Sequence, residues 1–131
     1  IKNNNLKKRI YFKYNLNLEE IAFAYRNASI LVYPSIYEGF GIPILEALYS
    51  KIPVITTKGG CFEEAGGTHT KYVNIKNTDE IVSAIKEIED NPDIRKEMID
   101  NGYAHAKTFC DKSVNEKLNN IYSDLVNESR S

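Results

Sequence analysis

The chain has 131 residues, of which 42% are hydrophobic and 27% are charged, and its formal net charge is −1. These values are typical of one globular domain, and the near-neutral balance gives no indication of a nucleic-acid partner. No apolar run approaches the roughly 18 residues of a membrane-spanning helix. Cys61 and Cys110 fit neither a disulfide framework nor a metal site, so we expect a cytoplasmic protein with reduced thiols.

The front of the chain is expected to contain a strand and then a helix. Residues 9–14 are rich in aromatic side chains and predict the strand. Asn17 can cap the helix, with Glu20 as its capping-box partner. The apolar face of that helix is expected to comprise Ile21, Ala24, Tyr25 and Ala28, which recur at helical spacing.

Residues 33–57 are expected to form a strand–loop–helix–strand unit. The apolar run at 30–33 predicts a strand covered on both faces, and Pro34 ends it because proline cannot donate to a sheet. Pro43 is typical of a first helical turn, and residues 54–56 predict a second strand. The helix between the strands is expected to bury Ile44, Leu45 and Leu48.

The rest of the chain is mostly helical in pattern. A glycine turn at 59–60 precedes a short helix at 61–65, and residues 72–75 predict an edge strand. An amphipathic helix over 81–88 follows. Another begins at Pro92 and runs to about residue 109, with Ile94 and Met98 as anchors and Gly102 softening it. A capping box formed by Ser113 and Glu116 predicts a last helix.

Alternating strands and helices predict an α/β fold, with a Rossmann-like parallel sheet covered by helices on both faces and a helical C-terminal segment. At most four strands are expected, whereas doubly wound sheets usually have about five or six. We therefore expect the sheet to be incomplete at its N-terminal side and residues 1–131 to be part of a longer protein. An uncovered sheet edge would favour self-association.

Two glycine-containing loops, at 35–42 and 57–61, are expected to leave the carboxyl ends of neighbouring strands, where parallel sheets bind ligands. Gly39 and Gly41 either make a tight turn or let the backbone approach a ligand closely. In the second case, the amides at the start of the following helix would suit a phosphate. Lys58 either touches that phosphate or is solvated.

Glu38 and Glu46 also admit two interpretations. They are either solvated surface acids or a pair that faces a cleft above the sheet edge. In a cleft they could bind sugars, because a carboxylate accepts strong hydrogen bonds from paired hydroxyl groups. No His, Asp or third Glu accompanies them, so we expect neither a metal site nor a cofactor.

Residues 38–48, EGFGIPILEAL, resemble the Glu-x7-Glu signature of the group 1 retaining glycosyltransferases, which have the GT-B fold. Neighbouring stretches are similar to that family in the same order. Residues 28–35 resemble the strand that leads to its Pro-Ser, and residues 51–55 resemble its Gly-x-Pro-Val-Ile strand, with Lys51 where glycine is usual. Residues 59–67, GGCFEEAGG, resemble a stretch whose glutamate is Glu64 here.

The resemblance implies a partial C-terminal domain that binds a nucleotide-sugar donor. Glu38 would be the catalytic residue at the donor sugar, and Glu46 would hold the ribose hydroxyls. Glu64 either meets the donor or caps the short helix. The remaining donor-binding positions would be Gly39, Phe40, Gly41, Ile42 and Gly60.

The resemblance also implies a glycan or lipid-linked acceptor, bound by an N-terminal domain that this chain lacks, and metal-free transfer with retention in polysaccharide biosynthesis. The parent enzyme would be cytoplasmic, with peripheral contact to the inner face of the membrane, and this fragment would be inactive alone. Lys7, Lys8 and Arg9 do not match the family's phosphate-binding Arg and Lys. Two alternatives therefore stay open: a non-catalytic Rossmann-like interaction module, and a sugar-nucleotide epimerase of similar fold.

Overall fold

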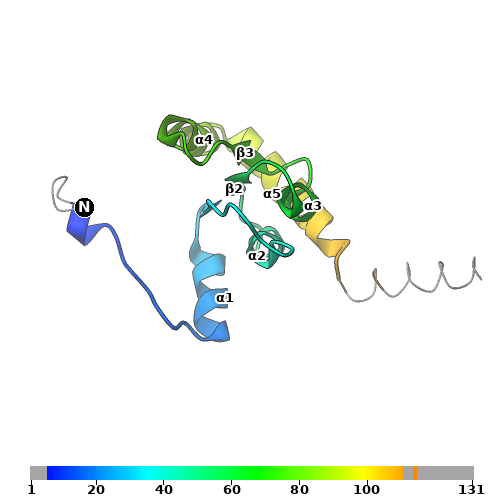
Figure 1. Ribbon diagram of the computed structural model, residues 1–131, viewed down its shortest axis with the longest axis horizontal. Helices are drawn as coiled ribbons and strands as arrows, with labels where there is room; N and C mark the ends of the chain where they lie inside the picture. Colours follow the sequence, from blue (N-terminus) through cyan, green and yellow to red (C-terminus); the bar gives the residue numbers. More distant parts are fainter. Residues whose placement is uncertain (1–5, 111–113, 115–131) are drawn as a thin grey trace, which may run out of the picture.

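A computed structural model describes residues 6–110 and residue 114 (Figure 1). Three short parallel strands form the sheet, in the order β1-β2-β3. They are β1 (Leu31–Tyr33), β2 (Val54–Thr57) and β3 (Lys71–Val73). Besides the 3-10 turn η2 (Leu6–Lys8), the helices are α1 (Leu18–Asn27), α2 (Ile42–Tyr49), α3 (Cys61–Gly66), α4 (Thr78–Asp90) and α5 (Pro92–Lys107).

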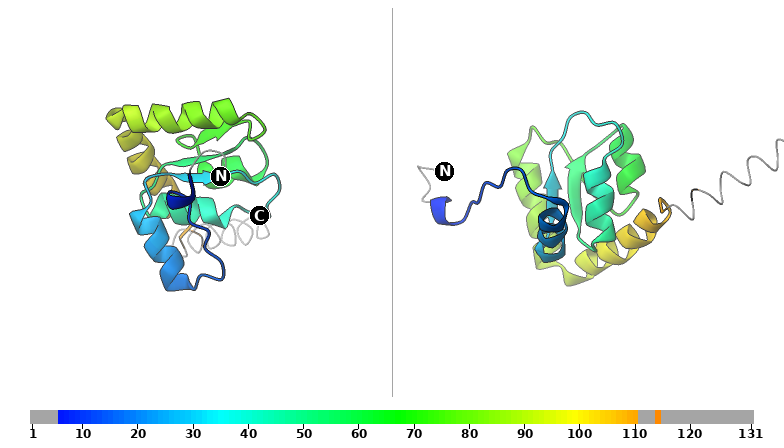
Figure 2. Two further views of the ribbon diagram at one scale, coloured as in Figure 1. Left: turned by 90° about the vertical axis from the view of Figure 1, so that its left-hand side faces the viewer. Right: turned by 90° about the horizontal axis from the view of Figure 1, so that it is seen from below.

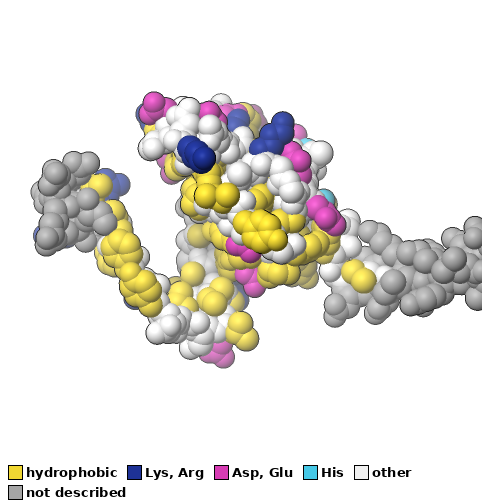
Figure 3. Space-filling view, in the orientation of Figure 1, with side chains coloured by type: hydrophobic (Ala, Val, Ile, Leu, Met, Phe, Trp, Pro, Cys, Tyr) yellow, Lys and Arg dark blue, Asp and Glu magenta, His cyan; other side chains and the backbone are white. Residues whose placement is uncertain are grey.

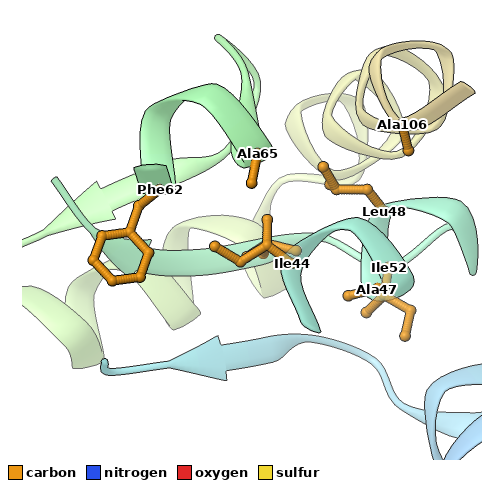
Figure 4. Close-up of a cluster of buried hydrophobic side chains, with 8 residues drawn as sticks. Ile44, Ala47, Leu48, Ile52, Phe62, Ala65 and Ala106 are labelled. Carbon is orange, nitrogen blue, oxygen red and sulfur yellow. The ribbon is translucent and has the colours of Figure 1, made fainter. Parts of the chain in front are cut away.

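Helices cover both faces of the sheet, as the alternating pattern predicts (Figure 2). Successive strand residues point to opposite faces, so Val54 joins the hydrophobic cluster beneath α2 and α3, while Ile55 joins the cluster beneath α4. Helix α5 contacts α2, α3 and α4. It contributes Ala106 to the first cluster, shown in Figure 4, and Met98 to the second, so it joins the two layers.

Local sequence signals set the helix boundaries where they were expected. The Asn17 side chain accepts a hydrogen bond of 2.9 Å from the Glu20 amide, and the Glu20 carboxylate accepts one of 2.9 Å from the Asn17 amide. This reciprocal capping box begins α1. Pro34 follows the last residue of β1, and Pro43 lies in the first turn of α2.

The prediction of a strand at residues 9–14 is wrong. This stretch is extended but pairs with no strand, and Tyr11 and Tyr14 are 78% and 77% exposed. The segment between η2 and α1 runs away from the sheet, with hydrophobic side chains along it (Figure 3). A strand exists only through hydrogen bonds to a partner, and the described part of the chain holds none for this segment.

Strand β1 is also less enclosed than its apolar sequence indicates. It forms one edge of the three-stranded sheet, Val32 is 36% exposed, and α1 has no buried residue. The prediction that the strand at residues 30–33 is covered on both faces is therefore wrong for the described residues, although helices lie on both faces of the sheet as a whole. Strand β3 lies at the other edge, as expected, although it ends at Val73. The last predicted helix lies outside the described residues.

Packing between α2 and α5 differs from the prediction at two positions. Ala47 is fully buried in the stripe of α2, whereas Leu45 is only half-buried. Gly102 does not merely soften α5, since it is buried and a Cβ there would lie 2.7 Å from Leu48 Cδ2. Because Gly102 has no side chain, α5 can pack closely against α2. On α5 itself, Met98 is buried as predicted, but Ile94 is 37% exposed.

Within residues 6–110, no helix has the length and apolar character needed to cross a lipid bilayer.

Candidate functional site

A hollow of ≈ 390 Å³ lies where the carboxyl ends of β1 and β2 meet. Its wall comes from the loop after β1, the loop after β2 and the first residues of α3. Glu38, Lys58, Gly60 and Cys61 are among the residues that line it. The prediction that the two glycine-containing loops meet at one edge of the sheet is thus confirmed, and the hollow occupies the position where parallel sheets bind ligands.

Hydrogen bonds from β2 and α3 hold the loop that carries Glu38. Thr56 Oγ1 donates to the carbonyl of Tyr33 over 2.9 Å, and Thr57 Oγ1 donates to that of Ser35 over 2.6 Å. Cys61 Sγ donates to the backbone carbonyl of Glu38 over 3.3 Å. None of these donors was predicted from the sequence, because each bonds to a residue more than one element away.

The Glu38 carboxylate is itself fixed by two hydroxyl groups. Its Oε1 accepts hydrogen bonds from the Tyr33 hydroxyl and, over 3.2 Å, from Ser35 Oγ. The bond to Glu38 is the main reason why the pKa of Tyr33 is raised, since a phenolate beside a carboxylate is disfavoured. Glu38 is half-buried, so it is not a fully solvated surface acid.

Glu46 does not line the hollow between β1 and β2. It is exposed on α2 and lines a second hollow, of ≈ 360 Å³, together with Tyr25 of α1 and Tyr49. The Tyr25 hydroxyl donates to the carbonyl of Pro43 over 3.4 Å. Burial, and then the negative charge of Glu46, raise the pKa of Tyr25 to about 12. The structure therefore does not bring Glu38 and Glu46 into one hollow.

Gly39 and Gly41 differ in whether their positions require glycine. Gly41 is buried with φ +84°, and a Cβ there would lie 3.3 Å from Ala65 Cβ, so the turn and its packing both need glycine. A Cβ on Gly39 would meet open space. Phe40 packs edge-to-face on Phe109 with ring centroids 5.7 Å apart, while Ile42 is 55% exposed. The side chain of Phe40 thus holds the loop against the residues that follow α5.

Gly60 lines the hollow, whereas Glu64 is not among the residues that line it. Gly60 precedes the helix with φ +59° and lines the hollow. Glu64 is exposed, and its backbone carbonyl lies 2.9 Å from Nε2 of His105 on α5. The His105 ring packs against Gly67, where a Cβ would lie only 2.9 Å from it. This contact between α5 and α3 was also missed from the sequence.

Comparisons with known proteins establish the family. The model of the family described as "Glycosyl transferases group 1" matches residues 1–105. This chain belongs to the group 1 glycosyltransferases. Among solved structures, it is similar to the C-terminal domain of a group 1 glycosyl transferase (LpcC) from Francisella tularensis, with a TM-score of 0.72 and 32% identity over 82% of this chain and 57% of that one. The predicted Rossmann-like α/β fold is confirmed.

Curated relatives of this group 1 glycosyltransferase chain include several mannosyltransferases. The O-antigen chain mannosyltransferase RfbU of Salmonella typhimurium is 42% identical over 67% of this chain and 25% of its own length. The O-antigen chain mannosyltransferase B of Escherichia coli is 31% identical over 82% of this chain and 28% of its own. The chain thus spans about a quarter of the length of these relatives.

Proposed function

We propose that this chain is part of the donor-binding half of a retaining glycosyltransferase, and that the hollow between β1 and β2 holds the transferred sugar of a nucleotide-sugar. The observation that carries the proposal is the Glu38 carboxylate, which is half-buried and held by hydroxyl groups at the edge of this hollow. An ionised acceptor forms stronger hydrogen bonds with sugar hydroxyls than a neutral one does.

Transfer of the sugar develops positive charge on its ring and negative charge on the departing nucleotide diphosphate. Glu38 lies where it can stabilise the sugar. The backbone of residues 39–42, at the start of α2, and Gly60 would receive the diphosphate, and Lys58 lines the same hollow. The donor would extend along α2, so that its ribose reaches Glu46 at the second hollow. Glu64 would contact the donor from α3.

The names of the relatives support a narrower proposal for the substrates. Both O-antigen enzymes are mannosyltransferases, so we infer a nucleotide-activated mannose as donor and a glycan or lipid-linked acceptor of surface polysaccharide assembly. The acceptor would bind to a part of the protein outside this chain, at the inner face of the membrane. The chain alone would then bind donor without transferring sugar.

The test is mannosyl transfer by the full-length protein that contains this sequence, measured with GDP-mannose and with UDP- and ADP-sugars as competitors. Glu38→Gln should lower kcat by about a hundredfold or more, in line with the loss of one transition-state contact. Glu46→Gln should chiefly raise KM for the donor. The matched control is Glu89→Gln, an exposed acid on α4, which should change neither value.

Unchanged transfer by Glu38→Gln would refute the assignment of the site. If the full-length protein bound no nucleotide-sugar at all, the non-catalytic interaction module would replace this proposal, and release of a rearranged free sugar donor without acceptor would indicate an epimerase. The anomeric configuration of the product, read by NMR, tests retention independently of the site residues.

A further inference from the structure

We propose that Tyr33 is a positioning residue of this site: together with Ser35 it binds one carboxylate oxygen of Glu38, Oε1, and so orients the other oxygen, Oε2, toward the sugar hydroxyls. The inference rests on the proposed function of Glu38. It goes further by stating how the carboxylate is oriented and which of its oxygens faces the ligand.

Both hydroxyl donors reach the same atom. The Tyr33 hydroxyl donates to Oε1 of Glu38, and Ser35 Oγ lies 3.2 Å from the same oxygen, sharing its single proton between it and the Tyr37 carbonyl at 3.3 Å. The terminal torsion of a glutamate side chain has a broad energy minimum, so an unrestrained carboxylate would rotate freely. Two donors on Oε1 remove that freedom before the ligand arrives, which is the condition for effective orientation.

The two hydrogen-bond donors, Tyr33 and Ser35, are held in place by the sheet. Tyr33 is the last residue of β1, and Pro34 restricts the backbone between Tyr33 and Ser35. Thr56 and Thr57 of β2 donate to the carbonyls of Tyr33 and Ser35 over 2.9 and 2.6 Å. The paired strands β1 and β2 therefore fix the positions of Tyr33 and Ser35, and these two side chains orient the carboxylate.

The engaged oxygen decides which part of Glu38 faces the ligand. With Oε1 held by Tyr33 and Ser35, Glu38 presents Oε2, whose two lone pairs can accept hydrogen bonds from sugar hydroxyls. The Tyr33 hydroxyl can keep its role as donor across the neutral range, because the ordinary pKa of tyrosine lies well above it and the bond to Glu38 raises the pKa of Tyr33 further.

The first test is Tyr33→Phe in the full-length protein, which keeps the ring and removes only the hydroxyl. We expect kcat to fall about tenfold, as for the loss of one hydrogen bond to a charged group, with KM for the donor nearly unchanged. The control is Tyr72→Phe. It removes a hydroxyl that donates to the carbonyls of Phe62 and Gly67, so it should lower Tm but not kcat.

A double-mutant cycle shows whether Tyr33 acts through Glu38. In the Glu38→Gln background, Tyr33→Phe should have almost no further effect on kcat. An equal, tenfold loss in both backgrounds would overturn the positioning role, as would an unchanged kcat in Tyr33→Phe when Glu38→Gln is inactive. The latter result would leave the proposed function intact, whereas an active Glu38→Gln would refute the proposed function itself.

Two further readouts do not depend on folding stability. In this chain, NMR of labelled tyrosine should show that Glu38→Gln lowers the pKa of Tyr33 toward its ordinary value of 10.0; an unchanged pKa would show that the contact is absent. With nucleotide-sugars that each lack one sugar hydroxyl, the effects of Tyr33→Phe and Glu38→Gln should vanish for the same analogues. If the two variants were sensitive to different hydroxyls, Tyr33 would not act through Glu38 and the inference would be wrong.

Discussion

Replacing Gly102 by alanine measures how tightly α5 packs on α2. The added Cβ would lie 2.7 Å from Leu48 Cδ2, and Leu48 is only 1% exposed, so its side chain has little room to move. Overpacking of this kind costs about 1–3 kcal/mol. Alanine in place of glycine inside a helix recovers about 1 kcal/mol. We therefore expect a net loss of about 1 kcal/mol in the free energy of unfolding.

Such a loss corresponds to a Tm decrease of about 4 °C for a chain of this size, which urea and thermal unfolding followed by circular dichroism would resolve. The background variant Leu48→Ala, which itself costs about 2–5 kcal/mol, removes the clashing methyl groups. In that background, Gly102→Ala should instead stabilise by about 1 kcal/mol. If Gly102→Ala stabilised the unmodified chain as well, Gly102 would only soften the helix and the close approach would not matter.

Four further substitutions test the loop, the tyrosines and the first helix. Gly41→Ala should cost about 1–2 kcal/mol because φ is +84°, whereas Gly39→Ala, whose Cβ meets open space, should stay within about 0.5 kcal/mol in the same thermal melts. Burial raises the pKa of Tyr25 and Tyr72 to about 12, so the stability that these residues contribute is present below pH 10 and is lost as the pH rises from 10 to 12. Tyr25→Phe should therefore weaken the loss of structure at alkaline pH, as followed by circular dichroism. An unchanged pH profile would contradict the assignment. Asn17→Ala removes the capping box and should raise the amide exchange rates of α1 by about fivefold, corresponding to ~1 kcal/mol, with α4 as the internal reference.

The sequence by itself determined the features that depend on near neighbours in the chain. Asn17 and Glu20 cap α1 because both partners lie within one helical turn, and Pro34 and Pro43 mark a strand end and a helix start through their own backbone geometry. The alternation of strands and helices was enough to predict a parallel sheet with two covered faces. The spacing of Glu38 and Glu46 within a glycine-containing motif was enough to indicate the family.

Only the tertiary structure decided what depends on distant partners. Residues 9–14 have a strand-forming composition, but a strand needs a neighbour to bond, and none of the described residues supplies one. Glu38 and Glu46 are close in the chain, yet α2 carries Glu46 toward α1 and away from the hollow.

Gly102 shows the same limit in the core, because its role comes from Leu48, which lies on another helix. The role of the Tyr33 hydroxyl likewise depends on its hydrogen bond to the Glu38 carboxylate, which only folding brings into place. Propensity and capping act over one turn of the chain, whereas burial, close packing and the orientation of a charged group are set by atoms that folding alone brings together.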